Sequence, residues 1–186
     1  MRKNLATLVA VIAAFSVSGL AVSTTPASAS ASSGYISGSG DWTDDWGDEG
    51  LLSTSSYAHS NVAAMWQAIL WADGQSDYFA SIDCRFGSKT NAATESWQDF
   101  HRLSADGIVG GQTLTTAARY LRGPAPGTSG YLTLTYIGHW LGGSASSDET
   151  GRYVTFTRNT SGQWGMYVGS DHHLLSYTSA NFNQCA

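Results

Sequence analysis

One eight-residue motif occurs twice in this chain and limits its possible folds more than any other feature. The pattern D-x-x-[apolar]-G-x-x-T is found at 83–90 and again at 106–113. An aspartate side chain can accept a hydrogen bond from a backbone N–H two residues further on, so each copy predicts a turn. The glycine permits a backbone geometry that a side chain would obstruct. We therefore expect two turns of the same design, each leading into a helix.

Three stretches have the 3.6-residue periodicity of helices, at 60–72, 88–103 and 111–121. In the first stretch, one apolar stripe is formed by Val62, Met65, Trp66, Ile69 and Leu70. We expect Ser60 and Ser88 to cap the first two helices through their hydroxyl groups. The two motif copies lead into the second and third helices.

After Gly123–Gly127, a segment with two prolines that ends helical structure, the period changes from 3.6 to 2. Alternating residues predict strands at 131–137, 152–158 and 163–169, with a fourth at 174–177. The turn at 159–162 would join the second and third strands as a hairpin. The expected fold class is α+β, with a three-helix bundle followed by a small antiparallel sheet.

The first 30 residues have the features of a signal peptide. Arg2 and Lys3 precede a mostly apolar run at 5–15, and Pro26–Ala29 offers a cleavage site with small residues. The run is too short to remain as a membrane anchor. We expect a secreted, extracellular or cell-wall-associated protein with no membrane attachment after cleavage.

The remaining chain divides into three parts by composition. Residues 31–49 are rich in Ser, Gly and Asp and have no period, which predicts a flexible acidic leader whose tryptophans pack against the folded part. Residues 50–123 form the expected helical domain, and residues 128–186 form a β-rich C-terminal extension.

The two cysteines, Cys84 and Cys185, both lie after the signal. An even count in an oxidising compartment predicts one disulfide, with free thiols or pairing between chains as the alternatives.

Removal of Arg2 and Lys3 with the signal would leave seven basic against fourteen acidic residues. This acidic balance argues against nucleic acid as a partner.

The motif copies belong to a longer pattern that spans residues 51–122. Its matching positions are Val62, Trp66, Gln67, Leu70, Asp83, Phe86, Gly87, Thr90, Ala93, Trp97, Gln98, Leu103, Asp106, Gly107, Val109, Gly110 and Thr113. In these residues the segment resembles the peptidoglycan-binding-like domain, a three-helix module that attaches secreted proteins to bacterial cell wall. The resemblance implies peptidoglycan as the partner, and no cofactor is expected.

The chain departs from the family pattern at two glycine positions, which are occupied by Cys84 and Arg102. The first departure suggests that the disulfide, rather than glycine freedom, holds the first turn. It also places the C-terminal tail over that turn, where the tail could cover part of a ligand site.

Peptidoglycan offers carboxylates, amides and sugar faces to a binding protein. Helix N-termini near Ser88 and Gly111 have free backbone N–H groups that can receive a carboxylate. Aromatic rings can pack on sugar or methyl groups. The candidate ligand-binding residues are Tyr78, Phe86, Gly87, Ser88, Thr90, Trp97, His101, Asp106, Gly107 and Gly110. The alternative is that the motif residues only organise turns and that Trp97 belongs to the core.

Catalytic chemistry has little support in the sequence, and we expect neither a catalytic residue nor a metal site. The available groups His139, Asp148, Glu149, Asp171, His172 and His173 lack the spacing of a zinc peptidase. No serine lies in a nucleophile-elbow context, and both cysteines are expected to be bonded. The aromatic residues Tyr136, Trp140, Tyr153, Trp164, Tyr167 and Tyr177 would form either a sugar-binding face or a core.

These features together predict a secreted, non-catalytic, monomeric peptidoglycan-binding protein. One alternative is a cell-wall hydrolase whose catalytic residues lie in the C-terminal part. Another is a secreted interaction protein, such as an inhibitor, that keeps the fold without binding glycan.

Overall fold

The computed structural model describes residues 29–76, 81–138 and 151–185. Their helices are α1 (Ala29–Ser33), α2 (Asn61–Ala72), α3 (Ser88–Phe100) and α4 (Gly111–Ala118), and their strands are β1 (Leu121–Arg122), β2 (Leu132–Ile137), β3 (Tyr153–Arg158), β4 (Trp164–Val168) and β5 (Asp171–Leu174). The α+β prediction is confirmed. Residues 1–28 of the predicted signal peptide lie outside the described residues, and so do the candidate residues Tyr78, His139, Trp140, Asp148 and Glu149.

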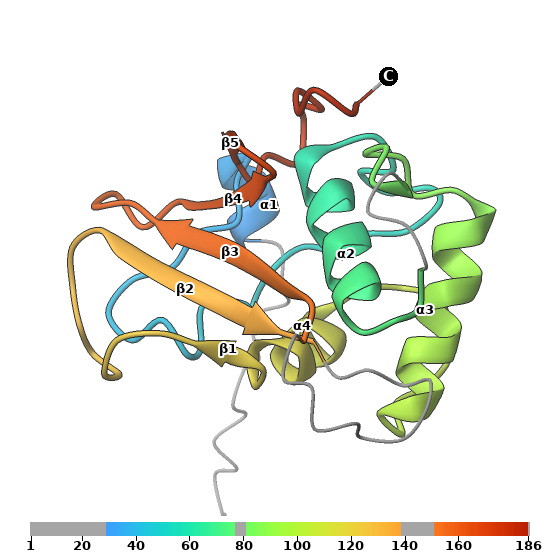
Figure 1. Cartoon of the computed structure of the whole chain (residues 1–186), viewed down its shortest axis with the longest axis horizontal. Helices are drawn as coiled ribbons and strands as arrows, with labels where there is room; N and C mark the ends of the chain where they lie inside the picture. Colours follow the sequence, from blue (N-terminus) through green and yellow to red (C-terminus); the bar gives the residue numbers. More distant parts are fainter. Residues whose placement is uncertain (1–28, 77–80, 139–150, 186) are drawn as a thin grey trace, which may run out of the picture.

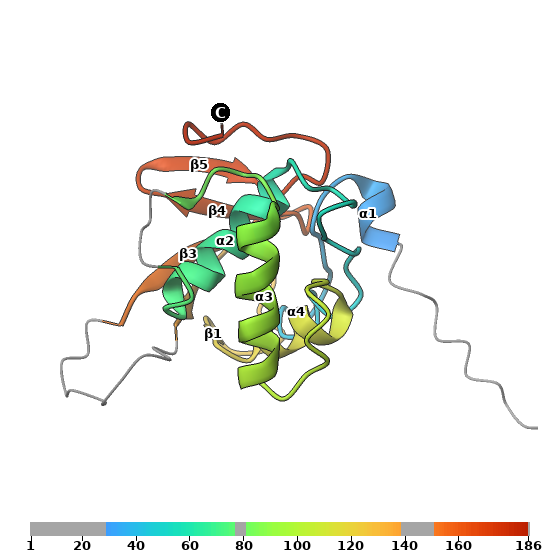
Figure 2. The same cartoon turned by 90° about the vertical axis from the view of Figure 1, so that its right-hand side faces the viewer.

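Helix α2 lies at the centre of the fold, with α3 on one side and strands β2 and β3 on the other (Figures 1 and 2). Every residue from Asn61 to Leu70 is buried, because small or apolar side chains occupy most positions of this helix and its buried polar residues, Asn61 and Gln67, are hydrogen-bonded. The periodic stripe in the sequence predicted only one buried face. The prediction of a three-helix bundle is not confirmed, since α2 packs against the sheet as well as against α3.

Helices α2 and α3 end in the same hydrogen-bonded arrangement, with one residue of positive φ after the C-cap. In α2 this residue is Gly74 (φ 72°), and the N–H of Gln75 donates to the carbonyl of Leu70 at 2.8 Å. In α3 it is Arg102 (φ 58°), and the N–H of Leu103 donates to the carbonyl of Gln98 at 2.9 Å. Arg102 therefore takes a conformation that favours glycine.

Replacement of Arg102 by glycine should raise the free energy of unfolding by about 0.5–1 kcal/mol, because a side chain in the left-handed region is disfavoured by steric contact with the backbone. Chemical denaturation of Arg102→Gly checks the prediction. The matched control is Arg119→Gly, since Arg119 also follows a helix but has φ −62°. Glycine there should lower stability, and equal effects of the two substitutions would contradict the explanation.

All five strands form one antiparallel sheet in the order β1-β2-β3-β4-β5. Two boundaries differ from the predictions. The third helix was predicted to reach Leu121, but α4 ends at Ala118 and Leu121 pairs with Tyr136 as part of β1. The last strand was predicted at 174–177, but β5 begins at Asp171 because a tight turn after Val168 pairs Val168 with Asp171.

Residues 31–49 differ from the expected flexible leader, because their apolar side chains enter the core. Ile36 and Trp46 are fully buried. The N–H of Ile36 donates to the carbonyl of Leu175, and the carbonyl of Ile36 accepts from the N–H of Trp164. The segment therefore runs beside the end of the sheet, and the Trp46 ring contacts the rings of Phe156 and Trp164 edge to face.

Two buried carboxylates fix this N-terminal segment to the C-terminal part of the chain. Asp45 accepts from Arg158 Nη1 at 2.6 Å and from Trp164 Nε1 at 2.8 Å. Burial raises the pKa of the Asp45 carboxyl, while the hydrogen bonds from Arg158 and Trp164 oppose this effect. Glu49 accepts from the Tyr177 hydroxyl at 2.8 Å. Some of the acidic residues of this segment are therefore buried and stabilise the fold.

Candidate ligand-binding site

A glutamine on α2 holds the first motif turn through both ends of its amide. Gln67 Nε2 donates to Asp83 Oδ1 at 2.8 Å and to the carbonyl of Arg85 at 3.0 Å. Its Oε1 accepts from the backbone N–H groups of Asp83 and Cys84, each at 3.0 Å. Asp83 Oδ1 also accepts from the N–H of Arg85 at 2.9 Å, which closes the predicted aspartate turn.

A glutamine on α3 holds the second motif turn in the same way. Gln98 Nε2 donates to Asp106 Oδ1 at 3.1 Å and to the carbonyl of Ile108 at 2.9 Å. Its Oε1 accepts from the N–H of Gly107, and Asp106 Oδ1 accepts from the N–H of Ile108, each at 2.9 Å. The sequence repeat is therefore also a structural repeat.

The remaining motif positions also have equivalent structural roles in the two copies. Thr90 Oγ1 accepts from Gln67 Nε2 at 3.2 Å, and Thr113 Oγ1 accepts from Gln98 Nε2 at the same distance. The apolar residues Phe86 and Val109 are both buried. Cys84 and Gly107 have φ values of 62° and 69°. Cys84 thus keeps the backbone conformation of the glycine whose place it takes.

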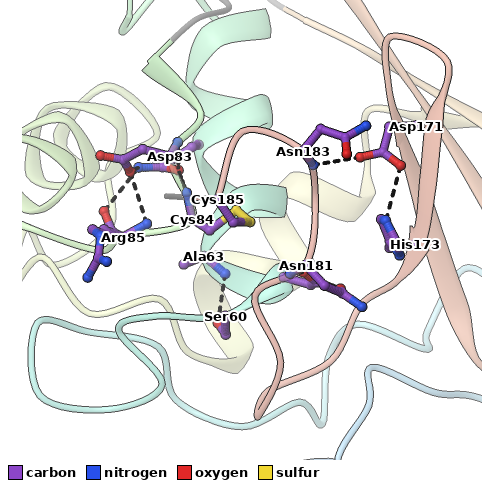
Figure 3. Close-up of a disulfide and its surroundings, with 12 residues drawn as sticks. Ser60, Ala63, Asp83, Cys84, Arg85, Asp171, His173, Asn181, Asn183 and Cys185 are labelled. Atoms are coloured by element: carbon purple, nitrogen blue, oxygen red, sulfur yellow. Dashed lines mark hydrogen bonds and ion pairs between the residues drawn. A yellow bond between two sulfur atoms is a disulfide. The ribbon is translucent and has the colours of Figure 1, made fainter.

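The disulfide between Cys84 and Cys185 is present, which confirms the predicted pairing (Figure 3). The tail that leads to Cys185 also contacts the start of α2. Asn61 Nδ2 donates to Asn181 Oδ1 at 2.6 Å, and the N–H of Asn183 donates to Asp171 Oδ2 at 2.7 Å. The tail crosses from the sheet to the first turn.

A pocket of about 620 Å³ lies beside the first turn and the start of α3. We call it the first pocket. Its described lining residues are Gln67, Leu70, Gln75, Ser76, Ser81, Asp83, Arg85, Gly87, Ser88, Lys89, Thr90 and Ala93. No residue of the tail 178–185 is among them. The tail therefore lies behind the turn without covering this pocket.

The N-terminus of α3 opens into the first pocket without a side-chain cap. The N-cap residue is Gly87, whereas the sequence predicted Ser88, which is instead the first helical residue. Gly87, Ser88 and Lys89 are exposed. The first backbone N–H groups of a helix have no intrahelical acceptor, and here no side chain of the N-cap residue replaces it. This end of the pocket offers hydrogen-bond donors.

A smaller pocket of about 220 Å³ lies at the equivalent position of the second copy. We call it the second pocket. Its described lining residues are Leu51, Gln98, Leu103, Ser104, Asp106, Ile108, Gly110, Gly111, Gln112 and Thr113. Helix α4 also has a glycine N-cap, Gly110, without a side-chain hydrogen bond. Each motif thus places a helix N-terminus beside a pocket.

The predicted ligand-binding residues occupy different environments. Gly87, Ser88 and Thr90 line the first pocket, and Asp106 and Gly110 line the second. The side chains of Phe86 and Trp97 and the backbone of Gly107 are buried, which leaves them no surface for a ligand. His101 is partly buried and packs against the rings of Trp97 and Tyr120.

The burial of Trp97 has a clear physical reason. Its Nε1 donates to Asp73 at 2.6 Å, and the same carboxylate oxygen accepts from the Tyr136 hydroxyl at 2.6 Å. This buried carboxylate joins the end of α2 to α3 and to β2. The described aromatic residues of the C-terminal part also divide, because Tyr136, Trp164 and Tyr177 are buried while Tyr153 and Tyr167 are exposed.

The described histidines of the sheet have structural partners. His172 Nε2 lies 2.9 Å from Thr157 Oγ1, and His173 Nε2 lies 3.0 Å from Asp171 Oδ1. Within the three described ranges, no group of three or more His, Cys, Asp or Glu side chains is placed to hold a metal ion. No helix in this part of the chain is long and apolar enough to cross a membrane.

Comparison with known families identifies the family that the segment with the repeated turns resembles. Residues 59–116 match the model of the putative peptidoglycan binding domain. This peptidoglycan-binding segment contains both motif copies, α2, α3 and most of α4. The resemblance inferred from the motifs is confirmed, and the segment implies a peptidoglycan partner. The disulfide fits an extracellular or cell-wall location. No curated protein and no solved structure matched the chain.

The glutamines Gln67 and Gln98 are the residues whose role sequence reasoning missed. Both occupy family positions, but their hydrogen bonds to turns 16 and 8 residues further on could not be read from the pattern. Lys89 and Arg85 were missed as pocket residues because both stand at variable positions of the motif. One signal was present, since Lys89 directly follows the candidate residue Ser88 at the predicted start of the helix.

Proposed function

We propose that this is a secreted, non-catalytic protein that binds peptidoglycan in the first pocket. The observation that carries the proposal is the position of this pocket, which is lined by residues of the first motif inside the peptidoglycan-binding segment. Its volume of about 620 Å³ lies in the usual range of small-molecule sites. The pocket could therefore receive part of a peptidoglycan repeat.

The pocket combines two kinds of surface that such a ligand needs. Ala93, which is partly exposed, offers apolar contact for methyl groups or a sugar face. Ser88 and the uncapped start of α3 offer hydrogen-bond donors. The turn that presents Gly87 and Ser88 is held by Gln67 and the disulfide, so little ordering is required when the ligand binds.

Co-sedimentation of the purified protein with peptidoglycan sacculi tests the function, and analysis of the supernatant tests the absence of catalysis. We expect the protein to sediment with the sacculi and the supernatant to contain no released fragments. Failure to sediment would refute peptidoglycan binding. Released fragments would show that the protein is a hydrolase.

Filling the first pocket should abolish sedimentation. Ala93 lines the pocket, so the indole ring of an Ala93→Trp variant would occupy the space of the ligand. Thr116 holds the equivalent position on α4, 23 residues later, and does not line the second pocket. The matched control Thr116→Trp should sediment like the unaltered protein. Equal sedimentation of two folded variants would place the binding site elsewhere.

A further inference from the structure

The described residues that line the two equivalent pockets differ in charge. Those of the first pocket include Asp83, Arg85 and Lys89, which sum to about +1 by side-chain type. Those of the second pocket include a single charged residue, Asp106, and sum to a negative charge. The positions of Arg85 and Lys89 are taken there by Ile108 and Gln112. The described lining of the first pocket is thus positive, although the chain as a whole has a net charge of −5.

Lys89 occupies a position that does not favour the stability of its own helix. It is the second residue of α3, where the positive end of the helix dipole disfavours a cation. Its side chain is exposed, and none of the ion pairs formed by the described residues includes it. A cation at this place adds to the donors of the helix N-terminus, so both attract an anion into the pocket.

The one acidic residue in the described lining of the first pocket is already engaged by the turn. Asp83 Oδ1 accepts from Gln67 Nε2 and from the N–H of Arg85. Asp106 makes the same two contacts in the second copy, so this carboxylate belongs to the shared scaffold. The difference between the pockets lies in the cationic residues at positions 85 and 89.

We propose that the first pocket selects a free carboxylate of peptidoglycan, and that Lys89 and Arg85 provide this selectivity. The proposal deepens the proposed function and rests on it for the source of the carboxylate. That source is a stem peptide or the lactyl group of a peptide-free glycan. The second pocket shares the uncapped helix start but lacks both cations, so it has no such preference.

Calorimetric titration with three soluble ligands tests the selectivity. The ligands are a stem peptide with free carboxylates, the same peptide with its carboxylates amidated, and peptide-free glycan that keeps its lactyl carboxylate. We expect amidation to weaken binding of the peptide at least fivefold, as for the loss of charge-assisted contacts in an exposed site. Binding of the glycan with the same dependence on Lys89 would assign the carboxylate to the lactyl group.

The repeat supplies matched variants for the same titration. Lys89→Gln introduces the residue of the second copy and should weaken binding of the free-carboxylate ligand about fivefold, without affecting the amidated peptide. Lys89→Arg should restore the affinity. Gln112→Lys adds one positive charge at the second pocket, whereas Lys89→Gln removes one at the first. The Gln112→Lys variant should leave the affinity unchanged.

The selectivity and the proposed function fail in different ways. Equal affinity for free and amidated peptide, or no effect of Lys89→Gln, would overturn the selectivity even if the protein sediments with sacculi. A gain in affinity from Gln112→Lys as large as the loss from Lys89→Gln would show a general charge effect and would also overturn it. Absence of sedimentation with sacculi would instead refute the proposed function.

Discussion

Reduction of the Cys84–Cys185 disulfide is expected to lower the free energy of unfolding by up to about 4.7 kcal/mol, because the bond closes a loop of 101 residues. Without it, the unfolded chain regains the conformational freedom that this loop removes. The measurement is chemical denaturation with and without a thiol reductant, followed by circular dichroism in the near and far ultraviolet.

The loss should affect the whole fold in one transition. The sequence suggested a β-rich unit attached to separate helices, which would melt first on reduction. In the structure, α2 packs against β2 and β3, and Asn61 on α2 contacts Asn181 in the tail. Helices and sheet therefore share one core. Separate transitions in the two spectral ranges would contradict this expectation.

Two variants separate the covalent bond from the backbone strain at Cys84. The Cys84→Ser/Cys185→Ser variant removes the bond but keeps a side chain at φ 62°. The Cys84→Gly/Cys185→Ser variant should be more stable by about 1 kcal/mol, because glycine adopts that conformation without strain. Equal stability of the two would show that the turn rearranges once the disulfide is lost.

Replacement of Arg158 by methionine should lower the free energy of unfolding by about 3–5 kcal/mol, because it leaves the buried carboxylate of Asp45 without its cation. The two groups are joined at 2.6 Å, and their side chains are only 4% and 1% exposed. Trp164 Nε1 would remain as a donor to Asp45, but a neutral donor does not replace a buried charge. Denaturation of Arg158→Met checks the value.

The double variant Asp45→Asn/Arg158→Met should recover most of this loss. Removal of both charges avoids the desolvation of an unpaired ion, and asparagine can still accept the bond from Trp164. If the double variant is no more stable than Arg158→Met alone, the destabilisation comes from lost packing around Arg158 rather than from the unpaired carboxylate.

The parts of the fold that could be predicted are those with a regular period or a recognisable cap. Helix α2 begins after Ser60, as predicted, and the Ser60 hydroxyl accepts from the N–H of Ala63. Strands β3 and β4 pair as the hairpin that their alternating residues and the turn at 159–162 predicted. In both cases a local pattern reflects a local cause, because the side-chain period follows from the backbone geometry.

The sequence predicted that the tryptophans of the N-terminal segment pack against the folded part, but it could not predict their partners, because these are distant in sequence. Trp46 packs against Phe156 and Trp164, more than 100 residues later, and Asp45 pairs with Arg158. Nothing in the Ser- and Gly-rich composition around these residues records such partners. Strand β1 was missed for a related reason, since its two residues form a strand only by pairing with β2.

The sequence predicted where the candidate site lies, but it did not predict which residues are exposed there. The motifs correctly indicated turns beside the starts of α3 and α4. They did not distinguish residues that build the turn from residues that face the pocket, so Phe86 and Trp97 were included although both are buried. Orientation of a side chain depends on the packing around it. A spacing pattern cannot express that packing.

The disulfide also changes how the protein would respond to a protease. The loop that it closes contains α3, α4 and all five strands. Hydrolysis of any single peptide bond between Cys84 and Cys185 would leave the two fragments joined through sulfur. Both fragments would still be anchored to the common core, and the turn beside the first pocket would stay attached to them. A molecule with one cleaved peptide bond would then separate into two fragments only after reduction. Cleavage of the backbone would therefore not by itself abolish ligand binding.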